Sequence, residues 1–141
     1  MKEYNSVSEP FLAELRAAVG EANVFTAPEK LEQYKTDEEY DPRRFRVPEA
    51  VVRPANAEEI AAVVKLCNKY NVPLTVRSGG TSLADGAIAV CGGIVLLMER
   101  LNKIIEMNTE AMYVIAEAGV RTIDIQKMAN DAGFLYAGDP C

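Results

Sequence analysis

The pattern of apolar and polar positions divides the chain into helices and strands that alternate through most of its length. In four stretches the apolar residues recur every three or four positions, which indicates an amphipathic helix. Serine, asparagine or threonine precedes most of these stretches and glycine often follows them, as is typical of helix ends. Helices are predicted from Ser8 to Gly20, after Pro28 as far as Tyr34, from Asn56 to Asn71 and from Thr122 to Gly133.

Short runs of β-branched and other apolar residues predict the strands. The strand at 50–53, the helix behind Asn56 and the strand at 73–77 form a βαβ unit with parallel strands and a right-handed crossover. Further strands are predicted at 94–97, at 103–107 and 112–116 as a hairpin, and from Phe134. The predicted fold class is therefore α+β, a βαβ unit followed by further strands and a helix.

The stretch with the least side-chain bulk, residues 76–87, follows the second strand of this unit. It reads VRSGGTSLADGA, with one arginine, three glycines and three hydroxyl side chains; we call it the glycine loop. Glycine lets backbone N–H groups approach an anion closely, and successive N–H groups can form an anion-binding nest. Open α/β sheets usually bind ligands at this carboxyl edge. The residue types fit either an anion site or a plain surface connection.

The residues that follow the glycine loop limit the kind of anion site it can form. A Rossmann GxGxxG turn or a P-loop leads directly into a helix. Here the chain continues through Gly92 and Gly93 into the strand at 94–97, and neither motif is present. A phosphate would therefore be held by loop amides and Arg77, and not by a helix that follows the loop.

Composition excludes several partners and reactions. The chain has 141 residues, of which 49% are hydrophobic and 26% charged, and its net charge of −6 disfavours nucleic acid and anionic membranes as partners. No apolar run is long enough to span a bilayer. With no histidine and three widely spaced cysteines, we expect no zinc site and no nucleophile activated by a histidine base. The polar N-terminus and the lack of a disulfide framework favour a cytoplasmic protein.

Residues 35–47 differ in composition from the rest of the chain. They are dense in charge, with Arg43, Arg44 and Arg46 close together, and they show no clear period. We therefore expect residues 1–47 to be a helical segment with a charged connection, and residues 48–141 to be the main domain. Because the chain ends just after a new strand, which would leave an unpaired edge, we expect the N-terminal fragment of a longer protein, able to dimerise through that edge.

Several motifs in this order resemble the FAD-linked oxidase family, whose flavin-binding fold vanillyl-alcohol oxidase and p-cresol methylhydroxylase share. The motifs are the strand, helix and glycine loop between Pro48 and Ala87, GGIVL at 92–96, LNKI at 101–104, AEAGV at 116–120 and GDP at 138–140. Their spacing is most similar to the branch that contains the flavoprotein of glycolate oxidase and D-lactate dehydrogenase. The resemblance implies the N-terminal part of an FAD-binding domain of the p-cresol methylhydroxylase type.

The resemblance also implies where FAD binds. In the family the loop after the second strand gives backbone amides to the FAD pyrophosphate, and a later Asp-Pro pair begins a second flavin-contacting segment. Carried over to this chain, the FAD-binding residues are Arg77, Ser78, Gly79, Gly80, Thr81, Ser82, Gly86, Ala87, Asp139 and Pro140. Covalent members have a histidine near the position of Thr81, so the FAD is expected to be noncovalent. Ser78 stands where relatives of glycolate oxidase usually have glycine.

The activity implied by the family is oxidation of a 2-hydroxy acid, such as glycolate or D-lactate, by an FAD-dependent dehydrogenase or oxidase. The electrons would pass to a protein acceptor, an electron-transfer flavoprotein or an iron–sulfur protein. The family's later glycine-rich segment and substrate domain are absent from these 141 residues. We therefore expect no catalytic residue here and no activity of this chain alone. A non-catalytic nucleotide-binding or assembly module with the same fold is the alternative.

Overall fold

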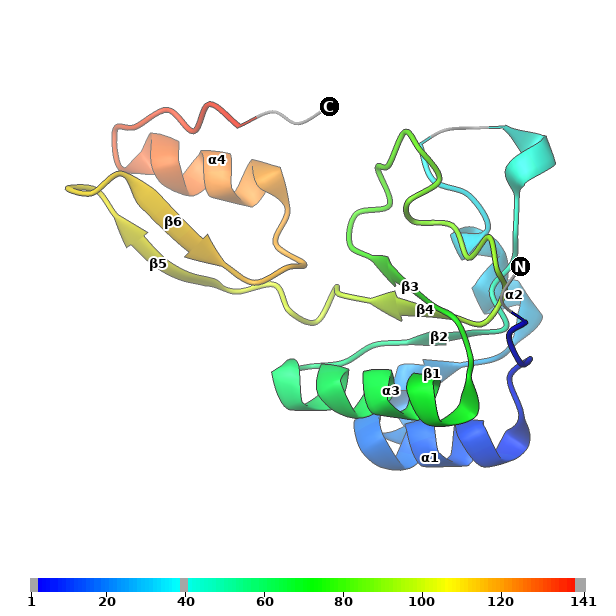
Figure 1. Cartoon of the computed structure of the whole chain (residues 1–141). Helices are drawn as coiled ribbons and strands as arrows, with labels where there is room; N and C mark the ends of the chain where they lie inside the picture. Colours follow the sequence, from blue (N-terminus) through cyan, green and yellow to red (C-terminus); the bar gives the residue numbers. More distant parts are fainter. Residues whose placement is uncertain (1–2, 39–40, 139–141) are drawn as a thin grey trace.

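The protein forms two groups of elements that follow one another along the chain (Figure 1). The structure is a computed structural model that describes residues 3–38 and 41–138. The amino-terminal lobe contains four strands and three helices and extends to residue 101. The carboxyl-terminal lobe contains a hairpin and one helix. A single extended segment after the last strand of the first lobe joins the two (Figure 1).

A four-stranded sheet forms the centre of the amino-terminal lobe. Its strands are β1 (Val24–Phe25), β2 (Ala50–Val52), β3 (Leu74–Arg77) and β4 (Ile94–Leu97), in the order β1-β2-β4-β3. β1 is antiparallel to β2, whereas β4 is parallel to both β2 and β3. The two strands of the predicted βαβ unit are thus parallel, but β4 lies between them and provides the pairing partner of each.

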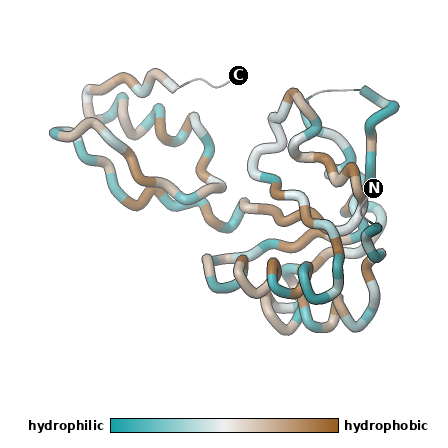
Figure 2. The backbone as a smooth tube through the Cα atoms, viewed as in Figure 1, coloured by the Kyte–Doolittle hydropathy of each residue, from teal (hydrophilic) through white to brown (hydrophobic). Residues whose placement is uncertain are grey.

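Helices cover both faces of this sheet, so its strands are apolar on both sides, as is usual for parallel strands. Figure 2 shows hydrophobic residues concentrated along these strands. α1 (Glu9–Val19) and α3 (Ala57–Tyr70) pack together on one face, and the short α2 (Pro28–Leu31) lies on the other. Three short 3-10 turns complete the lobe, at Glu21–Asn23, Glu32–Tyr34 and Pro42–Arg44.

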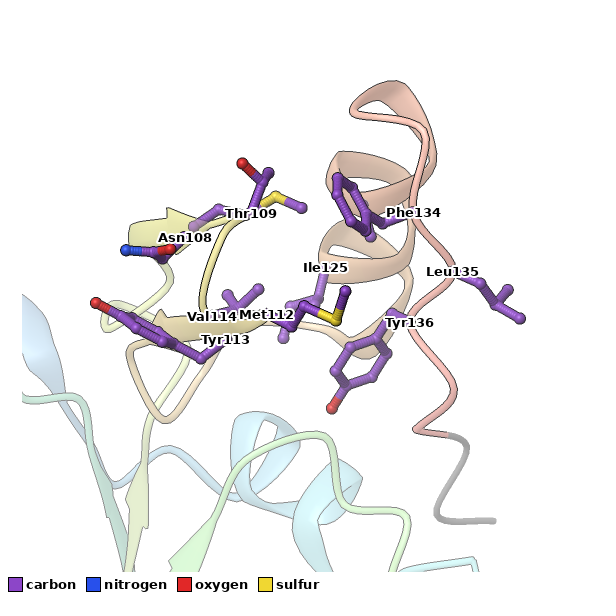
Figure 3. A pocket seen from close by; sticks show the side chains of 11 residues that line it. Asn108, Thr109, Met112, Tyr113, Val114, Ile125, Phe134, Leu135 and Tyr136 are labelled. Atoms are coloured by element: carbon purple, nitrogen blue, oxygen red, sulfur yellow. The ribbon is translucent and has the colours of Figure 1, made fainter.

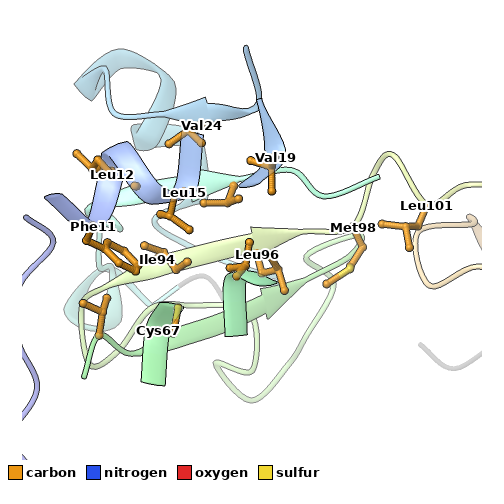
Figure 4. Close-up of a cluster of buried hydrophobic side chains, with 14 residues drawn as sticks. Phe11, Leu12, Leu15, Val19, Val24, Cys67, Ile94, Leu96, Met98 and Leu101 are labelled. Carbon is orange, nitrogen blue, oxygen red and sulfur yellow. The ribbon is translucent and has the colours of Figure 1, made fainter. Parts of the chain in front are cut away.

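The main core lies between the sheet and the two long helices (Figure 4). Its buried members from α1 and β1 pack directly against those from the later elements. These members are Phe11, Leu12, Leu15, Val19, Val24, Ala50, Val52, Val63, Cys67, Val72, Ile94, Leu96, Met98 and Leu101. Burial raises the pKa of the Cys67 thiol to about 11, so this side chain serves as a small apolar group. The core therefore crosses the predicted domain limit near Pro48.

Polar side chains fix the two ends of α3. Asn56 Oδ1 accepts a hydrogen bond from the N–H of Glu59 at 2.8 Å, as the sequence predicts. Glu59 reaches back to the N–H of Ala55 at 2.7 Å, one residue earlier than in a capping box. At the other end Asn71 adopts a left-handed conformation with φ of 52°, which asparagine tolerates better than most residues.

The carboxyl-terminal lobe follows most of the predicted pattern. β5 (Ile104–Asn108) and β6 (Tyr113–Ala116) form an antiparallel hairpin, and α4 (Thr122–Asp131) packs beside it. Thr122 is the first residue of α4 and not its cap, because Arg121 takes the capping position.

The strand predicted from Phe134 is wrong. Residues 134–138 pair with no strand in the described part of the chain. The N–H of Phe134 instead donates to Ala129 O at 2.8 Å and completes the end of α4. An apolar run alone does not make a strand when its backbone groups have no neighbouring strand to pair with. None of the helices in the described residues is long and apolar enough to cross a membrane.

We expect the Leu15→Ala substitution to lower the free energy of unfolding by about 2–5 kcal/mol. Leu15 is fully buried in the main core, although it precedes the predicted main domain. Urea unfolding followed by circular dichroism measures the change. Leu83→Ala is the control, since Leu83 is 63% exposed and its loss should change stability by less than about 0.5 kcal/mol. Equal effects of the two substitutions would show that α1 is not part of the same core.

Candidate functional site

A cleft of about 760 Å³ lies between the two lobes, beside the carboxyl end of β3. One side belongs to the glycine loop and the other to the turn before α4 and its first helical residues. The lining residues are Ser78, Gly79 and Thr81 on the first side, Gly119, Val120, Arg121, Thr122 and Asp124 on the second, and Glu99 and Asn102 between them. The cleft thus combines a predicted ligand loop with a segment that the sequence did not assign to it.

The glycine loop presents free backbone donors at this cleft. The N–H groups of Gly79, Gly80 and Thr81 have no hydrogen-bond partner among the described residues. The later part of the loop is closed by Ser82, whose Oγ accepts from the N–H groups of Ala84 at 3.1 Å and Gly86 at 2.9 Å. A run of N–H groups without internal partners is the feature that binds anions in loops of this kind.

Gly79 and Gly80 are glycines for different reasons. Gly80 has φ of +74°, and a Cβ there would lie 2.2 Å from Nη2 of Arg77, so the fold itself requires glycine. Gly79 has no such φ, and a Cβ there would meet only the Thr81 side chain, at an ordinary 3.8 Å. A methyl group at Gly79 would therefore fit the protein but would occupy part of the cleft. No contact among the described residues requires glycine here, and its small size leaves room for a ligand to approach.

Gly119 fixes the opposite side of the cleft at close range. Its N–H donates to Leu101 O at 2.7 Å, and an added Cβ would lie 2.1 Å from Met98 O and 2.8 Å from Leu101 O. A second bond crosses the cleft, from Ser78 Oγ to Ala118 O at 2.8 Å. Together these contacts set the separation between the lobes.

Each charged side chain that lines the cleft is held in an ion pair. Arg121 Nε donates to Asp124 Oδ2 at 2.8 Å, and this guanidinium lowers the pKa of the Asp124 carboxyl. Arg53 Nη1 donates to Glu99 Oε1 at 2.6 Å. An anion in the cleft would therefore be held mainly by neutral donors, among them the loop amides and the N–H groups of Thr122 and Ile123. These two N–H groups begin α4 and have no partner among the described residues, whereas that of Asp124 donates to Arg121 O.

Arg77 does not face the cleft as a free cation. Its Nη1 donates to Thr36 O at 2.8 Å and Ala87 O at 3.2 Å, and its guanidinium lies 5.8 Å from the Tyr34 ring centroid. Burial lowers the pKa of Arg77, while the opposite charge of Asp37 acts the other way. The expectation that Arg77 helps to hold a phosphate gains no support from this geometry, because the side chain lies beneath the loop.

The predicted site residues therefore divide into three groups. Ser78, Gly79 and Thr81 line the cleft, and Gly80 lies between them. Arg77, Ser82, Gly86 and Ala87 shape the loop from behind through the bonds given above. Asp139 and Pro140 lie outside the described residues. The sequence analysis did not assign Gly119 or Thr122 to the site, although Gly119 belongs to the AEAGV motif and Thr122 to a predicted helix start. The available signal was a glycine placed just before that helix start.

A second hollow lies within the carboxyl-terminal lobe (Figure 3). It measures about 210 Å³ and lies between the hairpin, α4 and the segment after it. Its lining is Met107, Asn108, Thr109, Met112, Tyr113, Val114, Ile125, Ala129, Phe134, Leu135 and Tyr136. No carboxylate, lysine, arginine or cysteine is among them, and the ionisable side chains in this lining are the two tyrosines. Nor do three or more metal-ligating side chains group together anywhere in residues 3–38 and 41–138.

These features define an α+β domain that can bind an anionic cofactor between a glycine loop and a helix start. Residues 48–140 match the family of the FAD binding domain. The chain therefore belongs to this family, and FAD is its cofactor. The free N–H groups and the space beside Gly79 fit the pyrophosphate of that cofactor.

Sequence similarity to individual proteins of known name supports this assignment to the family. The chain is 33% identical over 99 residues to glycolate oxidase subunit GlcD of Bacillus subtilis, covering 70% of this chain and 21% of that protein. It is 33% identical over 138 residues to D-lactate dehydrogenase of Anaerostipes hadrus, covering 98% and 29%.

The structure of p-cresol methylhydroxylase with substrate bound has the same fold. It superposes with a TM-score of 0.73 at 23% identity and covers 91% of this chain and 26% of its own. The predicted fold class is thus confirmed. The chain spans less than a third of the length of each of these proteins.

Alanine at Gly119 and alanine at Gly79 should have opposite consequences. Gly119→Ala places a methyl group against two carbonyl oxygens, and we expect it to lower the free energy of unfolding by about 1–3 kcal/mol. Gly79→Ala should change that free energy by less than about 1 kcal/mol. Thermal unfolding of the cofactor-free chain measures both. Equal loss of stability would contradict the assignment of Gly79 to ligand approach.

The same pair should separate again when FAD is added. We expect Gly79→Ala to weaken FAD binding about tenfold, because its methyl group takes space that the cofactor needs. Titration of the protein with FAD, followed by the quenching of flavin fluorescence, measures the dissociation constant. Unchanged affinity in the Gly79→Ala variant would place the cofactor away from this part of the loop.

Proposed function

We propose that this chain is the FAD-binding portion of a flavin-dependent oxidoreductase that oxidises a 2-hydroxy acid. The observation that carries the proposal is the cleft in which free N–H groups of the glycine loop face the first turn of α4. The relatives named for glycolate oxidase and D-lactate dehydrogenase support the 2-hydroxy-acid class.

The part of this chain in that function is to bind and orient the cofactor. The amides of Gly79, Gly80 and Thr81 would donate to the pyrophosphate, with the start of α4 on its other side. Bound FAD supplies the capacity to accept a hydride from the substrate carbon. The ionisable groups that line the cleft are tied up in the ion pairs of Arg121 and Glu99, so we assign no catalytic acid or base here.

The FAD would be held noncovalently. The chain has no histidine to bond the flavin methyl group, and the Thr81 hydroxyl is not a group that forms such a bond in the family. Electrons would leave to a protein acceptor, an electron-transfer flavoprotein or an iron–sulfur protein. Both statements are part of the proposal and rest on the family.

Binding of FAD to the purified 141-residue chain is the first test. We expect one FAD per chain, released into the supernatant when the protein is precipitated with acid. ADP should compete with FAD because it carries the pyrophosphate, whereas riboflavin, which lacks it, should not. Competition by riboflavin alone would show that the cleft does not recognise the pyrophosphate, and flavin retained after precipitation would contradict noncovalent attachment.

The substrate class is tested on the protein purified from its natural source. Glycolate or D-lactate added without oxygen should bleach the visible absorbance of the bound flavin, because the hydride is transferred to it. The matching 2-keto acids are the controls and should leave the absorbance unchanged. A protein that binds FAD but is bleached by no 2-hydroxy acid would instead be the non-catalytic module with the same fold.

A further inference from the structure

A segment ahead of the FAD-binding domain lies against the back of the glycine loop. We call residues 34–38 and 41–46 the strap. The family match begins at residue 48, so the strap lies outside it. Among the described residues, Arg77 and Arg44 each connect the strap to the loop.

Arg77 is the first of these connections. Its Nη1 joins Thr36 O of the strap to Ala87 O at the end of the glycine loop. The guanidinium also lies against the backbone of Gly80, where an added Cβ would be 2.2 Å from Nη2. One planar cation thus contacts the strap and both halves of the loop. A lysine could not make these contacts at once, because its ammonium is a single point donor.

The ion pair between Arg44 and Asp85 is the second connection. Asp85 adopts a left-handed conformation with φ of 57°, which is less favourable than the right-handed region for residues other than glycine, although aspartate and asparagine tolerate it better than most. The Asp85 side chain is 14% exposed, whereas that of Arg44 is 56% exposed. The strap therefore holds the loop at the residue whose backbone is least favourable.

The strap is itself anchored to the sheet. Leu31 and Tyr34, at its base, pack against the cluster on the α2 face formed by Val51, Val95 and Leu97 with Ala89. The N–H of Arg46 donates to Lys35 O at 2.9 Å and brings the two ends of the strap together. Because the strap is packed on the sheet, it cannot move freely. The loop that it contacts is therefore held in place as well.

We infer that the strap is a positioning element of the FAD site, which holds the glycine loop in the conformation that leaves the N–H groups of Gly79, Gly80 and Thr81 free for the cofactor. The inference rests on the proposed function. It assigns Arg77, Arg44 and Asp85 to the support of the loop and not to direct contact with the pyrophosphate. Pre-organisation of this kind lowers the entropy lost when a ligand binds.

Arg44→Met and Asp85→Asn test the ion pair with little risk to the fold. Asparagine tolerates the left-handed conformation of Asp85, and Arg44 is largely exposed. We expect each substitution to weaken FAD binding about two- to fivefold, and the double variant to lose no more than either single one. Additive losses would overturn the inference, because they would mean that the two side chains act separately on the ligand.

Arg43→Met is the matched control. Arg43 lies in the same segment and its side chain pairs with Asp41 of the strap, so its loss should leave FAD affinity unchanged. An equal loss of FAD affinity in Arg43→Met and Arg44→Met would mean that any positive charge near the site has the same effect. That result would overturn the inference.

Arg77→Lys separates positioning from charge. The substitution keeps the positive charge but removes the planar donor fork, and we expect it to weaken FAD binding about tenfold or more. Wild-type affinity in Arg77→Lys would mean that charge alone matters, and the inference would fail.

Amide hydrogen exchange in the cofactor-free chain provides a readout that does not depend on FAD. The N–H groups of Gly86 and Ile88 are bonded within the glycine loop, to Ser82 Oγ and Asp85 O. We expect their exchange to become at least about twofold faster in Arg44→Met and Arg77→Lys, but not in Arg43→Met. Unchanged exchange would contradict the inference that the strap supports the loop, even if the chain binds FAD. Faster exchange in a chain that binds no FAD would uphold the strap and reject the proposed function.

Discussion

The close contact of Gly119 with the carbonyl oxygens of Met98 and Leu101 is the constraint on which the site depends. No side chain fits between these backbones, so the turn before α4 lies directly on the segment that leaves β4. The bond from Ser78 Oγ to Ala118 O adds a second tie at the same junction. Because of these contacts the start of α4 faces the glycine loop, and neither lobe alone would form the cleft.

The cleft is suited to an anion although the chain is acidic. Its charged side chains are held in ion pairs, so the remaining donors are neutral: backbone N–H groups and the side chains of Thr81, Asn102 and Thr122. Neutral donors fixed by the fold can bind an anion without a free cation, which suits a chain whose net charge is −6. These N–H groups can bind an anion together only while the glycine loop keeps its conformation. The strap explains how a loop with so few bulky side chains does so, through the guanidinium of Arg77 beneath it and the ion pair at Asp85.

Local patterns predicted much of the fold, because helix ends, strands and turns depend largely on residues that are close in sequence. The sequence thus located the long helices, the hairpin and the edge at which a ligand loop opens. It missed β1, since two residues carry no periodic signal, and it did not place β4 between β2 and β3, which is a matter of tertiary pairing. It predicted a strand at Phe134, where no partner strand exists among the described residues. In the site, composition and position made the glycine loop a candidate ligand loop, and the resemblance to the FAD-linked oxidase family was needed to predict FAD there. The direction of the Arg77 side chain and the approach of Gly119 depend on contacts with residues distant in sequence, which no local pattern records.

The central claim is that FAD binds between the two lobes and contacts both. Two-dimensional NMR of the backbone amides during titration of the 141-residue chain with FAD tests it directly. The account predicts that the signals of Gly79, Gly80 and Thr81 shift together with those of Gly119 and Thr122, with the same apparent dissociation constant. Shifts confined to one lobe, or centred on the hollow between the hairpin and α4, would contradict it.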